Sequence, residues 1–315
     1  MLRASTARLA PIGFIGLGQM GGRMAPNCFK ADVCTELHYF DAAGAGPVDS
    51  PLTAGKKHVK HGSVADVAAA CKHIVTMLPN GAIVRDVYTT GLLPKLQKGT
   101  VLIDCSTVDP QTPKDMAKAA LAAGAAAFCD APVSGGVNAA AAGTLTFLVG
   151  GPAGDKAAFE ALGIEALLKA MGKNVFRCGD VGAGQVVKLS NNLILAQHMV
   201  AVSEAMLLGT RLGVDPKVLA QCVNTSTGRC WTSELYNPFP GVCPEAPSSK
   251  GYAGGFGASL MLKDVRLAID AAKTVRLPVT GASNAAAEYA KLCENPELKG
   301  LDFASMLKYL DGKKQ

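Results

Sequence analysis

The segment Ile12-Gly13-Phe14-Ile15 runs directly into Gly16-Leu17-Gly18-Gln19-Met20-Gly21, and this junction decides the fold. A short apolar strand that enters a G-x-G-x-x-G turn and then a helix is the arrangement that binds a dinucleotide pyrophosphate. The first glycine permits the tight turn, the second lets backbone approach the phosphates, and the third lets helix pack against strand. The helix N-terminus adds N–H groups and partial positive charge. The predicted cofactor-binding residues here are Gly16, Leu17, Gly18, Gln19, Met20 and Gly21.

A second apolar run, Leu37–Phe40, ends in Asp41, which lies 20 residues after Gly21. An acidic residue at this spacing accepts hydrogen bonds from the ribose hydroxyls of the cofactor. The carboxylate would repel a 2′-phosphate, and Ala42, Ala43 and Gly44, which follow it, carry no cation to neutralise one. The expected cofactor is therefore NAD rather than NADP.

From residue 11 to residue 179 short apolar runs alternate with helix-compatible stretches such as Val64–Cys71 and Lys114–Ala123. The runs are Ile12–Ile15, Leu37–Phe40, His73–Leu78, Val101–Ile103, Ala127–Ala131, Leu145–Val149 and Val175–Cys178. This alternation predicts an α/β Rossmann domain with a doubly wound, mainly parallel sheet. Ligands bind beyond the carboxyl ends of such strands, so Leu78, Pro79 and Thr107 are expected to face the NAD crevice. Pro26 falls inside the first helix, where a kink or an early end is expected.

The pattern changes after Gly179. No proline interrupts Ala183–Gly213, where apolar residues recur at helical period, and one helix of this length would measure about 46 Å. Asp215-Pro216 then supplies an N-cap and a proline at the first helical position. Residues 180–315 are therefore expected to form an all-α C-terminal domain, joined through the long connecting helix at about 183–213. Segment 224–257 is expected to be a long loop that is functional or mobile.

Composition limits the classes of function. The chain has 315 residues, of which 49% are hydrophobic and 18% charged, enough for two domains with sizeable cores. The net charge of +6 is scattered, and its densest cluster, Lys56, Lys57 and Lys60, reads as a solvated face, so no nucleic acid partner is expected. No stretch of about 18 residues is both apolar and free of charge, so a membrane span is not expected. The ten cysteines include no Cys-x-x-Cys and no zinc-finger spacing, which favours free thiols and no metal site.

The first ten residues carry Arg3, Ser5, Thr6 and Arg8, and the first acidic residue is Asp32. A start with arginine and hydroxyl residues but no acid is typical of a mitochondrial transit peptide. The alternative is an untargeted terminus of a cytoplasmic protein.

Two further motifs suggest chemistry. Ser134, Gly135 and Gly136 follow an apolar run, and a hydroxyl beside unhindered N–H groups suits a carboxylate, although such a stretch is also a common turn. In Gly182–Asn192, the residues Gly184, Lys188 and Asn192 share one helix face, with Val186, Val187 and Leu189 expected in apolar surroundings. Gly184 has no side chain and Asn192 carries an amide, so Lys188 is expected to have room for a ligand and a hydrogen-bond partner beside it. Partial burial would lower the pKa of Lys188 toward a value useful for proton transfer. The alternative is a lysine that snorkels from a buried helix.

These motifs together resemble the β-hydroxyacid dehydrogenase family. The similarity covers Pro11 to Leu310 and includes the glycine turn, Asp130–Gly136, Gly182–Asn192, and Gly254-Gly255-Phe256-Gly257 with Lys263-Asp264. The resemblance implies a Rossmann domain, a long connecting helix, and a helical domain that takes part in a homodimer or homotetramer.

The resemblance also implies roles for individual residues. Lys188 would be the catalytic acid/base. Ser134, Gly135 and Gly136 would hold the substrate carboxylate, and Asn192 would orient the substrate. Lys263 would reach the cofactor or substrate, and Trp231 and Phe256 would form a wall of the pocket. Thr227–Trp231 and Tyr236–Pro238 resemble the branch that acts in valine breakdown. The expected reaction is NAD-dependent oxidation of 3-hydroxyisobutyrate, a small hydroxyacid, to methylmalonate semialdehyde.

Other readings remain open. A tartronate, glyoxylate or succinic semialdehyde reductase would use the same residues, and a non-catalytic NAD-binding protein would keep the same fold. The branch that acts on 6-phosphogluconate has a histidine where this chain has Asn191. Asp264 is expected to orient the helix of Lys263 rather than to carry protons, and His198 to lie on a different face from Lys188.

Overall fold

In a computed structural model, the structure describes residues 11–151 and 156–313. The chain forms two compact units, Met1–Lys188 and Leu189–Gln315, and the division falls inside helix α8 (Ala183–Arg211). The sequence pattern changes earlier, at Gly179. The first turn of α8 belongs with the first unit because Asp130 and Gln185 hydrogen-bond it to the strand ends there.

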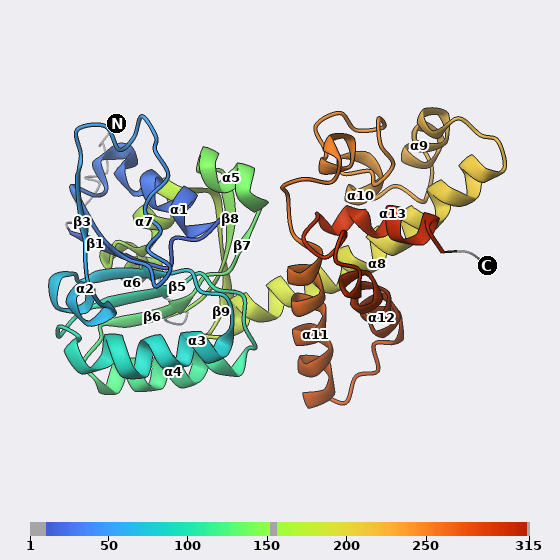
Figure 1. The fold of residues 1–315 in the computed structure, drawn as a ribbon. Coiled ribbons are helices and arrows are strands. Elements are labelled where there is room, and N and C mark those ends of the chain that lie inside the picture. The colour runs from blue at the N-terminus through green and yellow to red at the C-terminus, as the bar shows by residue number, and fades with distance from the viewer. Residues whose placement is uncertain (1–10, 152–155, 314–315) are drawn as a thin grey trace. The chain divides into compact units, whose positions relative to one another are not determined.

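The first unit is built on a nine-stranded sheet in the described residues (Figure 1). The strands are β1 (Ile12–Ile15), β2 (Glu36–Phe40), β3 (Lys57–Lys60), β4 (His73–Thr76), β5 (Val101–Asp104), β6 (Ala127–Asp130), β7 (Val133–Ser134), β8 (Leu145–Gly150) and β9 (Gly172–Gly179). Their order is β3-β2-β1-β4-β5-β6-β8-β7, with β9 paired to β8. Only the pairs β6–β8 and β7–β8 are antiparallel among the described strands. The predicted Rossmann fold is confirmed.

Helices cover both faces of this sheet (Figure 1). They are α1 (Gly21–Met24), η1 (Ala25–Asp32), α2 (Val64–Ala70), α3 (Gly81–Asp86), η2 (Val87–Leu92), η3 (Leu93–Lys95), α4 (Gln111–Ala122), α5 (Gly136–Ala142), α6 (Lys156–Ala161) and α7 (Ile164–Met171). Alternate strand residues enter two cores: Val75 and Ile103 pack with η1 and α7, whereas Ile74 and Leu102 pack with α2, η2 and α4. The sheet is therefore buried on both sides, as a parallel sheet requires.

Two local details test the sequence analysis. The α-helical part of the first helix ends at Met24, and a 3₁₀ segment with Pro26 at its start continues to Asp32. The expected early end is confirmed, because proline cannot supply the N–H that the α-helix needs. Strand β3 was not predicted: the cluster Lys56, Lys57 and Lys60 was interpreted as a solvated face, and two of these lysines lie in the strand. It is an edge strand, and Lys57 pairs with Glu36 of β2 at 2.7 Å.

The second unit is helical. Its elements after α8 are α9 (Pro216–Asn224), α10 (Trp231–Glu234), η4 (Pro247–Lys250), α11 (Ala258–Thr274), α12 (Thr280–Glu294), η5 (Phe303–Ser305) and α13 (Met306–Asp311). Asp215 caps α9 by accepting from the N–H groups of Lys217 and Val218, as predicted. The described residues after β9 form no strand apart from one bridge between Gly257 and Asp302.

The segment 224–257 is held together by its own polar contacts. The Ser248 hydroxyl donates to the Asn237 carbonyl at 2.6 Å, and the Tyr252 hydroxyl donates to the Pro238 carbonyl at 3.0 Å. Asn237, Ser248 and Tyr252 are all buried. This loop therefore has a fixed internal structure.

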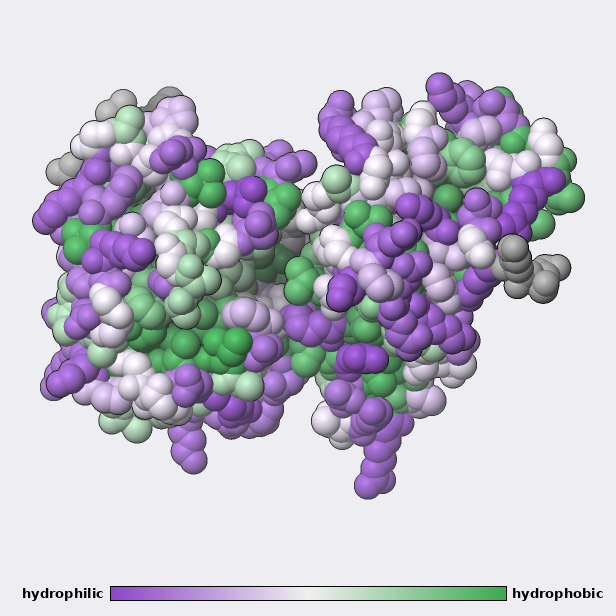
Figure 2. Space-filling model, in the orientation of Figure 1, coloured by the Kyte–Doolittle hydropathy of each residue, from purple (hydrophilic) through white to green (hydrophobic). Residues whose placement is uncertain are grey.

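Helix α8 is long and apolar enough to cross a membrane by length and composition. No such segment was expected from the sequence, because α8 is not free of charged residues. Its first turn is hydrogen-bonded to the sheet, and it carries the buried Lys188, as befits a connecting helix of a globular protein. Val186 and Val187 are 51% and 40% exposed, so the expectation of apolar surroundings was wrong for both and right only for Leu189. Polar residues dominate the visible surface of each unit, with apolar residues in separate patches (Figure 2).

Candidate active site

The glycine turn has the shape that a pyrophosphate needs. Gly16 has a φ of +87°, and a side chain there would clash with the carbonyl of Met77. At Gly21 a Cβ would clash with the carbonyl of Gly16 and lie 3.1 Å from a ring carbon of Phe14. At Gly18 a Cβ would meet nothing within 4 Å, so space remains beside this backbone. The turn fits a dinucleotide.

Asp41 lies against this turn. One carboxylate oxygen accepts from the Leu17 N–H at 2.7 Å, and the other accepts from Ala43 at 2.9 Å and Ala45 at 3.1 Å. The structure also brings Lys60 to the following loop, where its Nζ donates to the Gly44 carbonyl at 3.3 Å. Sequence reasoning missed this cation because it comes from β3 rather than from the residues after Asp41.

Leu78 and Pro79 follow β4, and Thr107 follows β5. Both strands lie on the same side of β1, the strand that enters the glycine turn. The Leu78 N–H donates to the Ser106 hydroxyl at 2.8 Å, and a Cβ on Gly16 would lie 3.1 Å from a methyl group of Leu78. The structure therefore brings these predicted crevice residues to the same edge of the sheet as the glycine turn.

The end of β5 is unusually polar for a buried position. Asp104 is fully buried and accepts from the hydroxyls of Thr76 at 2.8 Å and Ser106 at 2.6 Å. Burial raises the pKa of Asp104, and these hydrogen bonds oppose that shift. The same Ser106 holds Leu78, so one buried carboxylate organises the two neighbouring loops after β4 and β5.

Asp130, at the end of β6, caps the start of α8. Its carboxylate oxygens accept from the N–H groups of Gly182 at 2.6 Å and Gln185 at 2.9 Å. Burial raises the pKa of Asp130 to about 6, against the effect of these two hydrogen bonds. Sequence reasoning included Asp130 in a motif but gave it no role, because its partners lie 52 and 55 residues away.

Ser134, Gly135 and Gly136 follow this cap directly. Ser134 ends β7 opposite Thr146 of β8, and Gly135 and Gly136 have φ values of +133° and +69° at the start of α5. A Cβ on Gly136 would meet nothing within 4 Å. The backbone is therefore open at Gly136, whereas a Cβ on Gly135 would clash with the methyl group of Ala139. The carboxylate site at these residues stays a prediction.

Lys188 lies one turn after Gly184 on α8 and is 8% exposed. The sequence analysis took Gly184 to leave room for a ligand. The structure instead packs its backbone against β8, where a Cβ would clash with the Leu148 carbonyl and lie 2.8 Å from an oxygen of Asp130. The lowered pKa expected of Lys188 stays a prediction.

In the second unit, Asp264 connects two predicted site residues. Asn192 donates to one oxygen of Asp264 at 2.6 Å, and the Lys263 ammonium lies 3.0 Å from the other. Asp264 is buried. Asp264 was expected only to orient the helix of Lys263. In the structure it also contacts the side chains of Asn192 and Lys263 directly, and so positions both.

Trp231 and Phe256 belong to one aromatic cluster. Trp231 stacks on Tyr236 with 4.7 Å between ring centroids, Tyr236 stacks on Phe303, and Phe256 meets Phe303 edge-on. Asp302 ties the cluster together, since it accepts from the Tyr236 hydroxyl at 2.9 Å and the Phe256 N–H at 2.7 Å. Burial raises the pKa of Asp302 to about 6. Tyr236 was noted only for its sequence likeness, and Asp302 was missed.

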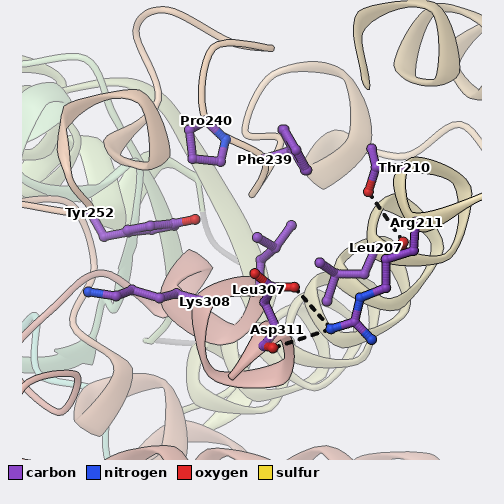
Figure 3. Close-up of a pocket in the computed structure, with 9 residues that line it drawn as sticks. All are labelled: Leu207, Thr210, Arg211, Phe239, Pro240, Tyr252, Leu307, Lys308 and Asp311. Atoms are coloured by element: carbon purple, nitrogen blue, oxygen red, sulfur yellow. Dashed lines mark hydrogen bonds and ion pairs between the residues drawn. The ribbon is translucent and has the colours of Figure 1, made fainter. Parts of the chain in front are cut away.

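A cavity of about 480 Å³ in the second unit contains none of the predicted site residues. Figure 3 shows Leu207, Phe239 and Leu307 around it, with Arg211 and Asp311 paired at its rim. The Tyr252 hydroxyl and the Thr210 hydroxyl both donate to backbone carbonyls. Most of the polar side chains that line it are thus already bonded within the protein.

Within the described ranges, no group of three or more histidine, cysteine or acidic side chains could hold a metal ion. The ten cysteines, all of which lie in those ranges, are free thiols.

Two family models match successive parts of the chain. The first, described as the NAD binding domain of 6-phosphogluconate dehydrogenase, matches residues 11–179, and the second, described as NAD-binding of NADP-dependent 3-hydroxyisobutyrate dehydrogenase, matches residues 182–310. A nicotinamide dinucleotide is therefore the cofactor, in agreement with the glycine turn and Asp41.

Relatives agree along almost the whole length. The mitochondrial 3-hydroxyisobutyrate dehydrogenase of Rattus norvegicus is 44% identical over 97% of this chain and 88% of its own. The 3-hydroxyisobutyrate dehydrogenase of Pseudomonas aeruginosa is 40% identical over 97% of this chain and 100% of its own. The solved structure of Mycobacterium tuberculosis 3-hydroxyisobutyrate dehydrogenase with L-serine has a TM-score of 0.84 and 33% identity, and covers 96% of this chain and 99% of that one. With both its units matched in order by family models and almost its whole length matched by relatives, the chain belongs to the 3-hydroxyisobutyrate dehydrogenase family of β-hydroxyacid dehydrogenases.

Proposed function

We propose that this chain oxidises 3-hydroxyisobutyrate to methylmalonate semialdehyde with NAD, as a step of valine breakdown. Its relatives are named 3-hydroxyisobutyrate dehydrogenase, which supports the substrate. The observation that carries the proposal is the placement of Lys188. It is a buried lysine on a helix whose first turn is hydrogen-bonded to the edge of the sheet where the glycine turn and Asp41 lie.

The proposed roles follow from the chemistry of each group. NAD, when bound, supplies the acceptor for the hydrogen and the two electrons that leave the alcohol carbon. Neutral Lys188 takes the hydroxyl proton, and the resulting ammonium stabilises charge on the substrate oxygen. Ser134, Gly135 and Gly136 donate to the substrate carboxylate, and Asn192 orients the substrate. These groups supply distance and orientation, which account for much of the rate of such a step.

Asp41 selects NAD over NADP in this proposal. Its carboxylate accepts from ribose hydroxyls and repels a 2′-phosphate. Gly16, Leu17, Gly18, Gln19, Met20 and Gly21 bind the pyrophosphate, and Leu78, Pro79 and Thr107 line the crevice. Lys263, held by Asp264, contacts the cofactor or the substrate, and Trp231 and Phe256 form an apolar wall.

We further propose a homodimer or homotetramer. Helix α8 exposes several apolar side chains that a monomer would leave in water, among them Ile194 and Leu208, which are 51% and 64% exposed. Light scattering on the purified chain tests this, and a monomer at micromolar concentration would contradict it. A mitochondrial location is also proposed, supported by relatives named mitochondrial; residues 1–10 lie outside the described residues. Imaging of a C-terminal fluorescent fusion tests it.

The activity is tested by following NADH absorbance with 3-hydroxyisobutyrate, L-serine, glycerate, 4-hydroxybutyrate and 6-phosphogluconate, each with NAD and with NADP. We expect the highest kcat/KM with 3-hydroxyisobutyrate and NAD. A higher kcat/KM with another hydroxyacid would replace the substrate but keep the mechanism. No turnover of any compound, with NAD still bound, would contradict a catalytic role.

A further inference from the structure

Gln185 is fully buried on the first turn of α8, and both ends of its amide are used. Its Oε1 accepts from the Val108 N–H at 3.1 Å, and its Nε2 donates to the Ser106 carbonyl at 2.8 Å. These two partners flank Thr107 in the loop after β5. The Gln185 side chain is thus hydrogen-bonded to the residues before and after Thr107, which the proposed function places at the NAD crevice.

This loop is itself joined to the neighbouring loop after β4. The Ser106 hydroxyl accepts from the Leu78 N–H at 2.8 Å and donates to Asp104 at 2.6 Å. Asp104 also accepts from Thr76, at the end of β4. A shift of the 105–108 loop is therefore transmitted along short, buried hydrogen bonds to Leu78 on one side and to Gln185 on the other.

Gln185 is equally well fixed to the helix of Lys188. Its backbone N–H donates to Asp130 at 2.9 Å, beside the bond from Gly182 at 2.6 Å. Lys188 follows three residues later, within the same turn of helix. Because the start of a helix moves as a unit, a displacement at Gln185 displaces the amine of Lys188.

The burial pattern of this turn is the reverse of what stability alone would favour. Gln185 and Lys188 are buried, whereas Val186 and Val187 between them are exposed. Burying an amide is favourable only when it is fully hydrogen-bonded, and exposing two valines forgoes their burial. A helix turned with its polar residues inward in this way keeps the amide of Gln185 on the crevice loop.

We propose that Gln185 is a positioning residue that couples the NAD crevice loop to the helix of Lys188, so that cofactor binding fixes the placement of the proton acceptor. The proposal rests on the proposed function for the role of Lys188. The physical coupling between loop and helix is a separate matter, and NAD alone can test it.

The test compares the wild-type chain with Gln185→Met, which keeps length and burial but makes neither hydrogen bond. Gln197→Met is the matched control, because the amide of Gln197, also on α8, donates to the Leu193 carbonyl of its own helix at 2.9 Å. Hydrogen–deuterium exchange is measured with and without saturating NAD on peptides that cover residues 105–108 and 183–190. Steady-state kinetics give kcat, KM and the pH profile of kcat/KM for each variant.

In the wild-type chain and Gln197→Met, NAD should slow exchange in both segments. In Gln185→Met it should slow exchange at 105–108 only, while kcat falls about 100-fold, the effect of roughly 1 Å of misplacement, and KM for NAD changes less than threefold. A shift in the limb of the pH profile that reports Lys188 should accompany this loss. Protection of 183–190 that survives in Gln185→Met, or is absent in the wild type, overturns the inference. If no hydroxyacid is turned over, the proposed function fails, and the exchange data still decide the coupling.

Discussion

Gly184→Ala is the substitution whose effect can be worked most directly from the structure. The backbone of α8 at Gly184 lies against β8, and a Cβ there would sit 2.8 Å from an Asp130 carboxylate oxygen, 3.0 Å from the Gly150 nitrogen, and closer still to the Leu148 carbonyl. Ordinary carbon–oxygen contacts are about 3.3–3.6 Å, so the helix must move away from the strand by about 1 Å. Two of these atoms belong to the backbone, and the Asp130 oxygen is held by its hydrogen bond from the Gln185 N–H.

The consequence for stability is small and for catalysis large. Alanine stabilises a helix by about 1 kcal/mol relative to glycine, whereas overpacking costs about 1–3 kcal/mol, so the free energy of unfolding should fall by about 2 kcal/mol or less. The same displacement moves Lys188, one turn along, and about 1 Å of misplacement lowers kcat about 100-fold. NADH absorbance measures kcat, and thermal unfolding measures stability.

Gly209→Ala is the matched control for that experiment. It makes the same substitution in the same helix, but the new methyl group would meet only the side-chain end of Leu219, which can rotate away. Its kcat should stay within threefold of wild type. A Gly184→Ala enzyme with full kcat would refute the argument that the contact with β8 sets the position of Lys188.

The remaining predictions concern single groups. Lys188→Ala should lower kcat by about 10²–10⁴-fold and leave the NAD dissociation constant nearly unchanged, and near-full activity would remove Lys188 from its proposed role. Asp41→Asn should lower the preference for NAD over NADP by about tenfold or more in kcat/KM, since the variant no longer repels a 2′-phosphate and the Lys60 ammonium of β3 reaches the loop that follows Asp41. Asp302→Asn should flatten the dependence of Tm on pH between about 4 and 6. The pKa of Asp302 is raised to about 6 in the folded state, so in this window the folded chain binds a proton that the unfolded chain releases. The folded wild-type chain therefore loses stability as pH rises from about 4 to 6. An unchanged slope in Asp302→Asn would mean that other groups, such as Asp130, carry the whole effect.

The cofactor half of the site was readable from sequence because its signals are local. Strand β1, the glycine turn and Asp41 lie within one βαβ unit, and each glycine has a steric reason that a short pattern can express. Strand β3 escaped the same reading for a physical reason. An edge strand pairs on one side only and can be solvated on its faces, so Lys57–Lys60 needs no apolar alternation.

The groups that position Lys188 were not readable, because their partners are distant in sequence. Asp130 meets Gly182 and Gln185 across 52 and 55 residues, and Gln185 meets Val108 and Ser106 across 77 and 79. No periodicity or spacing rule links such residues. The sequence did contain one local indication of these contacts, namely a glutamine between a glycine and two valines in a helix otherwise rich in apolar residues.

That indication also explains why two expectations about α8 failed together. Reading Val186 and Val187 as buried, and Gly184 as space for a ligand, both assume that a helix turns its apolar face inward. In this helix the inward face is set by what the first turn must bond to: the Asp130 carboxylate needs N–H donors, and the 105–108 loop needs the Gln185 amide. Once those bonds fix the rotation of the helix, Gly184 must face the strand, Lys188 must be buried, and the valines must face outward. The orientation of Lys188 is therefore a consequence of the polar contacts of its helix, and the apolar pattern alone predicts it incorrectly.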